Sequence, residues 1–144
     1  MKLKKQFKIF VCFLFVTTFA ATFYSCQKDT QNNPATSTAD RDKFLGSWVS
    51  QSSGAVHGSL SFTMSITAGN SSASQIRMEN FDGEGPGTFV FADISGNSIS
   101  ISRNIVNGDT IQGTGTYNSN NTLGFNYSFR DGQTVDNRTA TAHK

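Results

Sequence analysis

Apolar and polar side chains alternate along much of the chain after about residue 44. The pattern is clearest over residues 57–68, where Leu60, Phe62, Met64 and Ile66 are separated by serine and threonine. A period of two predicts a β-strand with one buried and one exposed face. Eight short strands are predicted in this way, over residues 44–51, 57–68, 74–81, 88–94, 98–103, 110–117, 122–130 and 138–144.

Turn-forming residues separate these segments. Ser52–Ala55 is predicted to be a loop, and Asp82–Gly87 is too rich in glycine for regular structure. Asn107-Gly108 is a strong hairpin signal, because both residues tolerate a positive φ. Gly113 and Gly115, within a predicted strand, indicate sharp curvature or a close approach of the backbone to another part of the chain.

The predicted domain spans residues 40–144, and only Asp40–Lys43 is expected to form a helical turn. Eight short antiparallel strands joined in sequence favour an all-β fold, an up-and-down meander closed as a small barrel. Closure would remove the exposed strand edges that invite aggregation. A β-sandwich is the alternative arrangement of the same strands.

The first 25 residues have a different pattern. Four lysines lie within the first eight residues, and an apolar run follows over residues 9–21. This is the layout of a secretory signal peptide, and the run is shorter than the roughly 20 residues that span a bilayer.

Ser25-Cys26 resembles the end of the lipobox of bacterial lipoproteins, in which signal peptidase II cuts before a cysteine that carries acyl chains. Phe23 and Tyr24 stand where that motif usually has Leu and a small residue. The resemblance implies that residues 1–25 are a lipoprotein signal peptide and that Cys26 anchors the protein to a membrane through its lipid. Residues 26–39 would form a flexible tether. An uncleaved signal anchor, or cleavage near the end of the apolar run, is the alternative.

The residues after the cysteine leave two readings open. Gln27-Lys28-Asp29 resembles a surface-export signal of some Gram-negative lipoproteins, and it is equally an ordinary polar tether. The expected location is the cell envelope, lipid-anchored at the outer membrane, either periplasmic or surface-exposed.

Gly46-Ser47-Trp48, at the start of the first strand, is similar to the Gly-x-Trp signature of lipocalins and related barrels. The span 40–144 also resembles small Gram-negative lipoproteins with lipocalin-like domains. The resemblance implies that Gly46 lets the chain pass tightly beneath the barrel floor. It also implies that Arg138, by position, is the basic residue that packs on Trp48 and helps to close the barrel.

Charge excludes one class of function. All ten Asp and Glu follow Cys26, whereas four of the twelve Lys and Arg precede it, so the mature chain would carry about −2. A weakly acidic chain without a basic stripe argues against nucleic-acid binding.

The sequence contains few residues in arrangements suited to catalysis. His57 and His143 are the only histidines, and no nucleophile–histidine pair, zinc-ligand cluster or cofactor motif is evident. Asp82 and Glu84 are candidate calcium ligands or parts of a plain turn, and the plain turn is favoured. We therefore expect no enzyme activity, no metal and no cofactor.

Aromatic residues of the predicted strands are candidates to line an apolar ligand pocket, or they form the core of a domain that needs them for stability. They are Phe62, Phe89, Phe91, Phe125, Tyr127 and Phe129. Two functions follow, both for a monomeric lipoprotein. In one, the barrel binds a small apolar or amphiphilic ligand. In the other, the barrel is solid and its surface contacts a protein or polymer partner.

Overall fold

The computed structural model describes residues 38–144. The predictions for the signal peptide, for Cys26 and for most of the tether lie outside the described residues. A short helix, α2 (Thr38–Asp42), precedes the strands, and a single-turn 3-10 helix, η1 (Phe81–Gly83), follows the third of them. None of the helices within residues 38–144 has the length and apolar character needed to cross a membrane. The strands are β1 (Gly46–Gly54), β2 (Gly58–Ala68), β3 (Gln75–Glu79), β4 (Phe89–Ser95), β5 (Ser98–Val106), β6 (Asp109–Asn118), β7 (Thr122–Asp131) and β8 (Thr134–His143).

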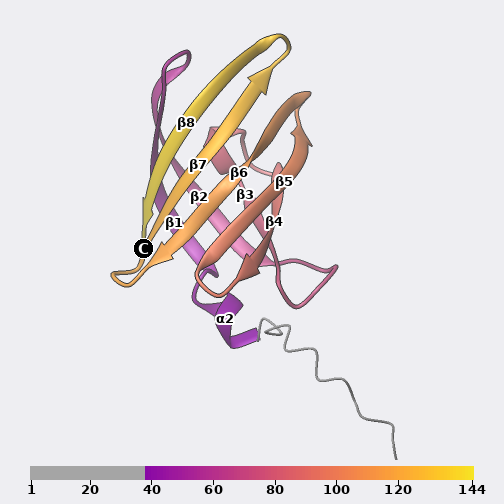
Figure 1. The fold of residues 1–144 in the computed structure, drawn as a ribbon, viewed down its shortest axis with the longest axis vertical. Helices are drawn as coiled ribbons and strands as arrows, with labels where there is room; N and C mark the ends of the chain where they lie inside the picture. The colour runs from indigo at the N-terminus through magenta and orange to yellow at the C-terminus, as the bar shows by residue number, and fades with distance from the viewer. Residues whose placement is uncertain (1–37) are drawn as a thin grey trace, which may run out of the picture. The chain divides into compact units, whose positions relative to one another are not determined.

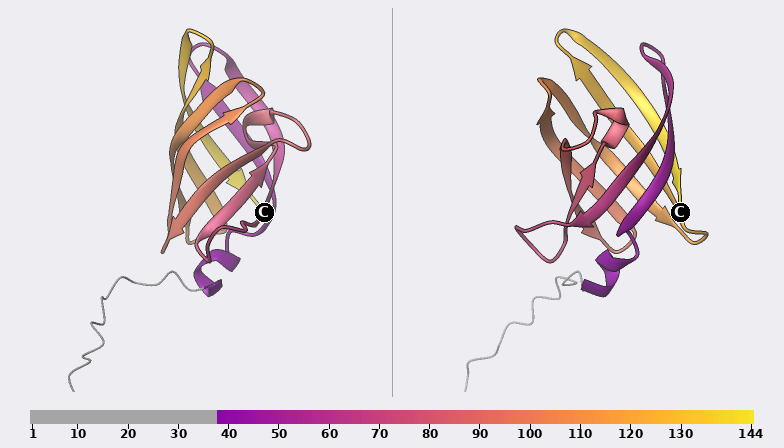
Figure 2. Two further views of the ribbon diagram at one scale, coloured as in Figure 1. Left: turned by 90° about the vertical axis from the view of Figure 1, so that its right-hand side faces the viewer. Right: turned by 180° about the vertical axis from the view of Figure 1, so that it is seen from behind.

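The strands form one closed antiparallel barrel in sequence order (Figures 1 and 2). The closing pair is β1 with β8, in which Val49 lies opposite His143 and Gly54 lies opposite Arg138. The predicted all-β up-and-down barrel is therefore confirmed, and the sandwich alternative is wrong, because the eight described strands belong to one closed sheet.

The hairpin between β5 and β6 is the one that the sequence predicts. Val106 pairs with Asp109, so the turn consists of Asn107 and Gly108 alone. Their φ angles are 53° and 99°, as a two-residue turn with two left-handed positions requires.

Two strands extend into segments where no strand was predicted. β1 continues through the predicted loop as far as Gly54, and β8 begins at Thr134 rather than at Arg138. The inward-facing residues in these extensions are Ser52 and Asp136, both of them buried. Polar residues on the buried face hid both extensions, because alternation is recognised by its apolar members.

A bulge explains the extra length of β5. The register shifts between Ile101 and Asn104, which breaks the period of two and hides the second half of the strand. The side-chain amide of Asn104 accepts a hydrogen bond from the Phe91 N–H (2.9 Å) and donates one to the Phe91 carbonyl (3.0 Å). This amide takes the place of backbone pairing between β4 and β5 beyond the bulge.

The α2 end of the barrel is closed by aromatic side chains. Trp48 is fully buried, and its indole N–H donates to the Phe44 carbonyl at 2.8 Å. Tyr117 meets the rings of Phe44 and Trp48 edge to face, at centroid distances of 5.5 and 6.5 Å. Gly46 has a φ of 122°, a conformation that residues with a Cβ rarely adopt, which explains the glycine two residues before the tryptophan.

The cation over Trp48 is Lys144, and the prediction that Arg138 packs there is wrong. The Nζ atom of Lys144 lies 4.7 Å from the centroid of the Trp48 ring. Arg138 lies six residues earlier, opposite Gly54 at the other end of β1. Since a strand rises about 3.3 Å per residue, the two positions are about 20 Å apart along β8.

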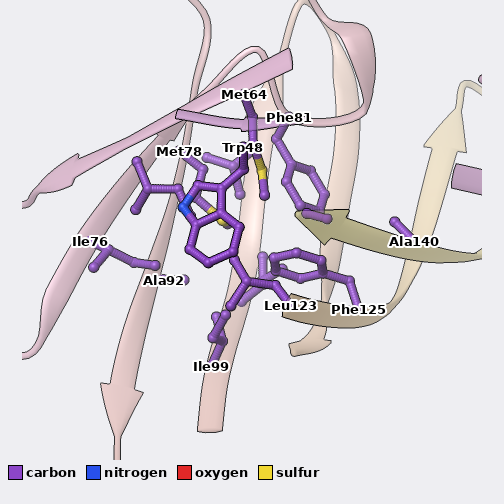
Figure 3. Close-up of a cluster of buried hydrophobic side chains, with 14 of the residues drawn as sticks. Trp48, Met64, Ile76, Met78, Phe81, Ala92, Ile99, Leu123, Phe125 and Ala140 are labelled. Carbon is purple, nitrogen blue, oxygen red and sulfur yellow. The ribbon is translucent and has the colours of Figure 1, made fainter. Parts of the chain in front are cut away.

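The barrel interior holds one cluster of buried side chains, part of which is shown in Figure 3. Its largest fully buried members come from the α2 end, from most of the strands and from η1. They are Phe44, Trp48, Met64, Ile66, Ile76, Met78, Phe81, Val90, Ile99, Ile111, Leu123 and Phe125.

Two inward-facing glycines of β6 make room for aromatic rings of β7. A Cβ on Gly115 would lie 2.7 Å from Cδ1 of Phe125, and a Cβ on Gly113 would overlap the backbone of β7 at Asn126 and Tyr127. The predicted close approach at these glycines is confirmed.

We expect Gly115→Ala to lower the free energy of unfolding by about 1–3 kcal/mol, because the methyl group overpacks the core against Phe125. Gly124→Ala is the matched control on the neighbouring strand. Its Cβ would meet only the side-chain amide of Asn118, at 4.0 Å. That change should be neutral or stabilise by about 0.4–1 kcal/mol. Urea denaturation of both variants measures the difference, and equal stabilities would contradict the packing described.

Candidate functional site

A cluster of buried charged and polar side chains lies inside the barrel, at the end remote from α2. Arg138, Asp136 and Asp82 are at least nine-tenths buried, and so is Ser52. Ionised groups in a protein interior are costly unless each is paired and hydrogen-bonded. This cluster is the one place in the described barrel where charges replace an apolar core.

The guanidinium of Arg138 contacts three different elements. Its Nε lies 3.0 Å from Oδ2 of Asp82, its Nη1 lies 2.9 Å from Oδ2 of Asp136, and its Nη2 donates to Oγ of Ser52 at 2.8 Å. These partners belong to η1, β8 and β1. Arg138 therefore ties the connection between β3 and β4 to the seam at which the barrel closes.

Asp82 reaches this position through an unusual backbone. Its φ is 57°, in the left-handed region where aspartate is tolerated better than most residues. Its Oδ1 accepts hydrogen bonds from the hydroxyl of Ser52 (2.8 Å) and from the phenol of Tyr127 (2.6 Å). Burial, and then the hydrogen bond and charge of Asp82, raise the pKa of Tyr127, which keeps the phenol protonated as a donor.

Phe81, the residue before Asp82, is inserted into the barrel beside it. Its ring meets Phe125 and Tyr127 edge to face, at centroid distances of 5.3 and 5.0 Å, and Phe62 at 6.4 Å. Figure 2 shows η1 crossing beside β2, and Figure 3 shows the ring of Phe81 among the other core side chains. Phe81 and Asp82 thus form a plug at this end, which we call the η1 plug.

Asp136 ties the hairpin between β1 and β2 to β8. It accepts hydrogen bonds from the backbone N–H groups of Val56 (3.1 Å) and His57 (3.0 Å), and Nδ1 of His57 lies 3.2 Å away. A Cβ on Gly54 would overlap the carboxylate, so this glycine leaves room for it. Burial alone would raise the pKa of Asp136, but the two N–H groups and Arg138 outweigh it, so the pKa lies well below its usual value.

The structure brings together some of the predicted pocket residues and separates others. Phe62, Phe125 and Tyr127 are buried inside the barrel, and Phe129 is partly buried, with its ring edge to face with His57 at 5.5 Å. Their rings pack on other side chains, as the core alternative expected.

The prediction that Phe89 and Phe91 line the interior is wrong. On β4 the buried face consists of Val90, Ala92 and Ile94, and Phe91 is 42% exposed on the outer face. Both faces of this strand carry apolar residues, so alternation could not decide which one turns inward. Phe89 is half-buried, and the guanidinium of Arg77 lies 4.5 Å from its ring centroid.

The sequence carries one signal for this cluster, in the last strand. Asp136 and Arg138 have the same parity as Ala140 and Ala142, which were predicted to share one face of the last strand. Extending that face backwards places both charges inside the barrel. Asp82 had no comparable signal, because it lies in a glycine-rich connection.

The candidate calcium ligands Asp82 and Glu84 have other partners. Asp82 is committed to Arg138, and Glu84 accepts a hydrogen bond from the side-chain amide of Asn107 at 3.0 Å. Within residues 38–144, no group of three or more His, Cys, Asp and Glu is arranged to hold a metal ion.

Two open hollows lie on the outer face of the barrel. One, of about 600 Å³, crosses β5 to β8 and is lined by residues that include Gln112, Thr114, Asn126 and Thr139. The other, of about 530 Å³, crosses β8, β1 and β2. Thr139 lines both hollows, so they meet on β8.

Comparison with known proteins identifies the fold and nothing finer. The chain matches no protein-family model, and it has no significant match among curated proteins. A redesigned β-barrel superimposes with a TM-score of 0.54 at 13% identity, covering 76% of this chain and 97% of that one.

Two further structures carry the name of a bound molecule. The redesigned barrel mFAP1, bound to DFHBI, gives a TM-score of 0.53 at 15% identity, with 75% of this chain and 100% of that chain covered. EF1p2_mFAP2b, also bound to DFHBI, gives 0.52 at 11% identity, with 74% and 98% covered. At these identities the likeness shows that the chain is a closed β-barrel of this kind.

We expect acid to destabilise the protein through Asp136. Since its folded-state pKa is depressed, its charge stabilises the fold above the unfolded-state pKa of about 4, and this stabilisation is lost as the pH falls below that value. Asp136→Asn should therefore be less stable than the wild type at pH 7, with a difference that shrinks at pH 3. Urea denaturation at both pH values measures this. Asp93→Asn, at an exposed position on β4, is the control and should lose as much stability between pH 7 and pH 3 as the wild type. An equal loss of stability for Asp136→Asn and the wild type would contradict the pairing of Asp136.

Proposed function

We propose that this protein is a lipid-anchored lipoprotein of the cell envelope, whose solid barrel presents its outer surface to a partner. The single observation that carries the proposal is that the interior is filled and both ends are closed. Phe44 and Trp48 close the α2 end, and the η1 plug closes the other. An eight-stranded barrel has an interior just wide enough for its own side chains or for one small ligand, and here side chains occupy it.

The charged groups of the barrel support a role without catalysis. Arg138 pairs with both Asp82 and Asp136, which leaves a formal charge of −1. Hydrogen bonds from Ser52 and Tyr127 to Asp82, and from the backbone of Val56 and His57 to Asp136, occupy the carboxylate oxygens. A catalytic acid or base needs a free site beside it for a substrate. These three groups stabilise structure instead, so we propose that the protein is not an enzyme.

The anchor is proposed from the sequence alone. Cys26 follows a cationic start and a short apolar run, and Ser25 precedes it as in a lipobox. The proposed location is the outer membrane, on its periplasmic or its outer side, with the barrel beginning a short distance along the chain from the lipid.

Cys26→Ala should release the protein from membranes, because no acyl chain can then be attached at that position. Cys12→Ala is the matched control: it lies in the apolar run that cleavage removes, so membrane attachment should not change. Fractionation of cells with a carbonate wash measures the distribution of both variants. Retention of Cys26→Ala in the washed membranes would count against the lipid anchor.

A small ligand inside the barrel is the second candidate function, and one buried group favours it. The hydroxyl of Ser50 is buried, and within residues 38–144 it has no hydrogen-bond partner. A buried donor without a partner costs about 1–3 kcal/mol, and a polar group of a ligand would satisfy it. The DFHBI complexes of mFAP1 and EF1p2_mFAP2b are examples of ligand binding by barrels of this fold.

Native mass spectrometry separates the two functions. For residues 27–144 secreted to the periplasm, we expect the bare protein mass, because the interior is filled by side chains. Ser50→Ala should leave the mass spectrum unchanged apart from the substitution. A reproducible extra mass in the wild type that denaturation removes, and that Ser50→Ala loses, would replace the solid barrel by a ligand-binding one.

A further inference from the structure

The outer face of five neighbouring strands carries mainly hydroxyl and amide side chains, and its exposed exceptions are Val49, Arg130, Val135 and His143. The strands are β6, β7, β8, β1 and β2, of which β6, β7 and β8 lie side by side in Figure 1. We call this surface the hydroxyl–amide face. Its residues are Gln112, Thr114, Thr116, Asn126, Ser128, Asn137, Thr139, Thr141, Gln51, Ser53, Ser59 and Ser61.

Strand register places these side chains in continuous rows around the barrel. One row runs through residues that lie directly opposite one another on successive strands: Thr114, Asn126, Thr139, Ser53 and Ser59. The next row contains Thr116, Gly124, Thr141, Gln51 and Ser61. Since paired strands are about 4.8 Å apart, each row presents hydrogen-bonding groups over roughly 19 Å.

The side chains of the hydroxyl–amide face are uncharged, and their hydrogen-bonding groups are free to bind a partner. None of them makes a side-chain hydrogen bond or ion pair with another residue of the described range. The strands β3 and β4 differ, because their outer faces carry Arg77, Glu79 and Asp93. Two cations lie beside the face: Arg103 lines the larger hollow, and Arg130 is exposed on β7 two residues after Ser128.

Both hollows are cut into this face and meet at Thr139. Six of the nine residues of the smaller hollow face outward and carry a hydroxyl or an amide: Gln51, Ser53, Ser59, Ser61, Thr139 and Thr141. A concave surface with closely spaced donors and acceptors can surround a ligand that itself carries both.

The chemistry of the face argues against three kinds of partner. Protein interfaces are enriched in aromatic side chains, Met and Arg and depleted in Ser, which is the reverse of this face. Nucleic acid requires clustered cations, and a lipid surface requires an apolar patch. What remains is an uncharged partner rich in hydroxyl groups.

We propose that the hydroxyl–amide face binds a neutral polysaccharide, whose hydroxyl groups are donors and acceptors without charge. The inference rests on the proposed function, since it names the partner of the outer surface. Thr139 is the central contact, because the chain of the polymer would have to pass it in moving from one hollow to the other.

Affinity electrophoresis of the full chain in a polyoxyethylene detergent tests the proposal. Gels contain dextran, mannan or xylan as neutral probes, and alginate as an anionic probe. We expect retardation by at least one neutral polysaccharide and none by alginate. Thr139→Ala should weaken binding about three- to tenfold, the value of one or two hydrogen bonds, and Thr139→Lys at least about tenfold.

Thr67→Lys is the matched control, since Thr67 is an exposed threonine of β2 that accepts a hydrogen bond from Arg77 beside the charged strands. It should bind like the wild type, and circular dichroism checks that all variants fold. No retardation by any of the three neutral probes, equal retardation by alginate, or unchanged binding by Thr139→Lys would overturn the proposal. Those outcomes leave the solid, lipid-anchored barrel standing, because membrane release and native mass test that separately.

Discussion

The burial of one guanidinium governs the structure of the barrel at the end remote from α2. Arg138 is fully enclosed, so each of its charged neighbours must be held where it can neutralise the cation. Asp82 meets this need from η1 and Asp136 from β8. Ser52 accepts a hydrogen bond from Arg138, and Ser52 and Tyr127 both donate to Asp82. The η1 plug, the β1–β2 hairpin and the closing seam therefore depend on the same few hydrogen bonds.

The two ends of the barrel are closed by opposite chemistry. At the α2 end the indole of Trp48 is covered by Phe44, Tyr117 and the ammonium of Lys144, in contacts that lose little when one partner shifts. At the other end an unpaired charge would be left if any member moved, which is far more costly. A buried ion pair adds little net stability, but it allows few alternative arrangements, so the η1 plug has one defined position.

The sequence predicts the barrel well, because most of its strands alternate cleanly and its turns carry glycine and asparagine. It fails where the buried face is polar or the outer face apolar. Asp136 and Arg138 look like exposed residues although they point inward, and Phe91 looks like a core residue although it points outward. Alternation along a strand shows which positions are polar, but it does not show which face of the strand points into the barrel. The direction of β4 is set by the register of its neighbours, and the position of Arg138 by Asp82, which lies over fifty residues away in the chain.

Closure of the sheet explains only part of the composition of the outer surface. An open sheet needs charged residues along its edges to prevent association, and a closed barrel has no such edges. Closure therefore permits an uncharged face, yet solubility alone would still favour Lys and Glu on exposed strands. Charged residues do occur outward on β3, as Arg77 and Glu79, and on β4, as Asp93, and the rows through Thr139 lack them. Two hollows lined by hydroxyl and amide groups lie in that uncharged region. Because a polar partner must replace the water that these groups bind, a polymer of hydroxyl groups fits the face better than any charged or apolar surface would.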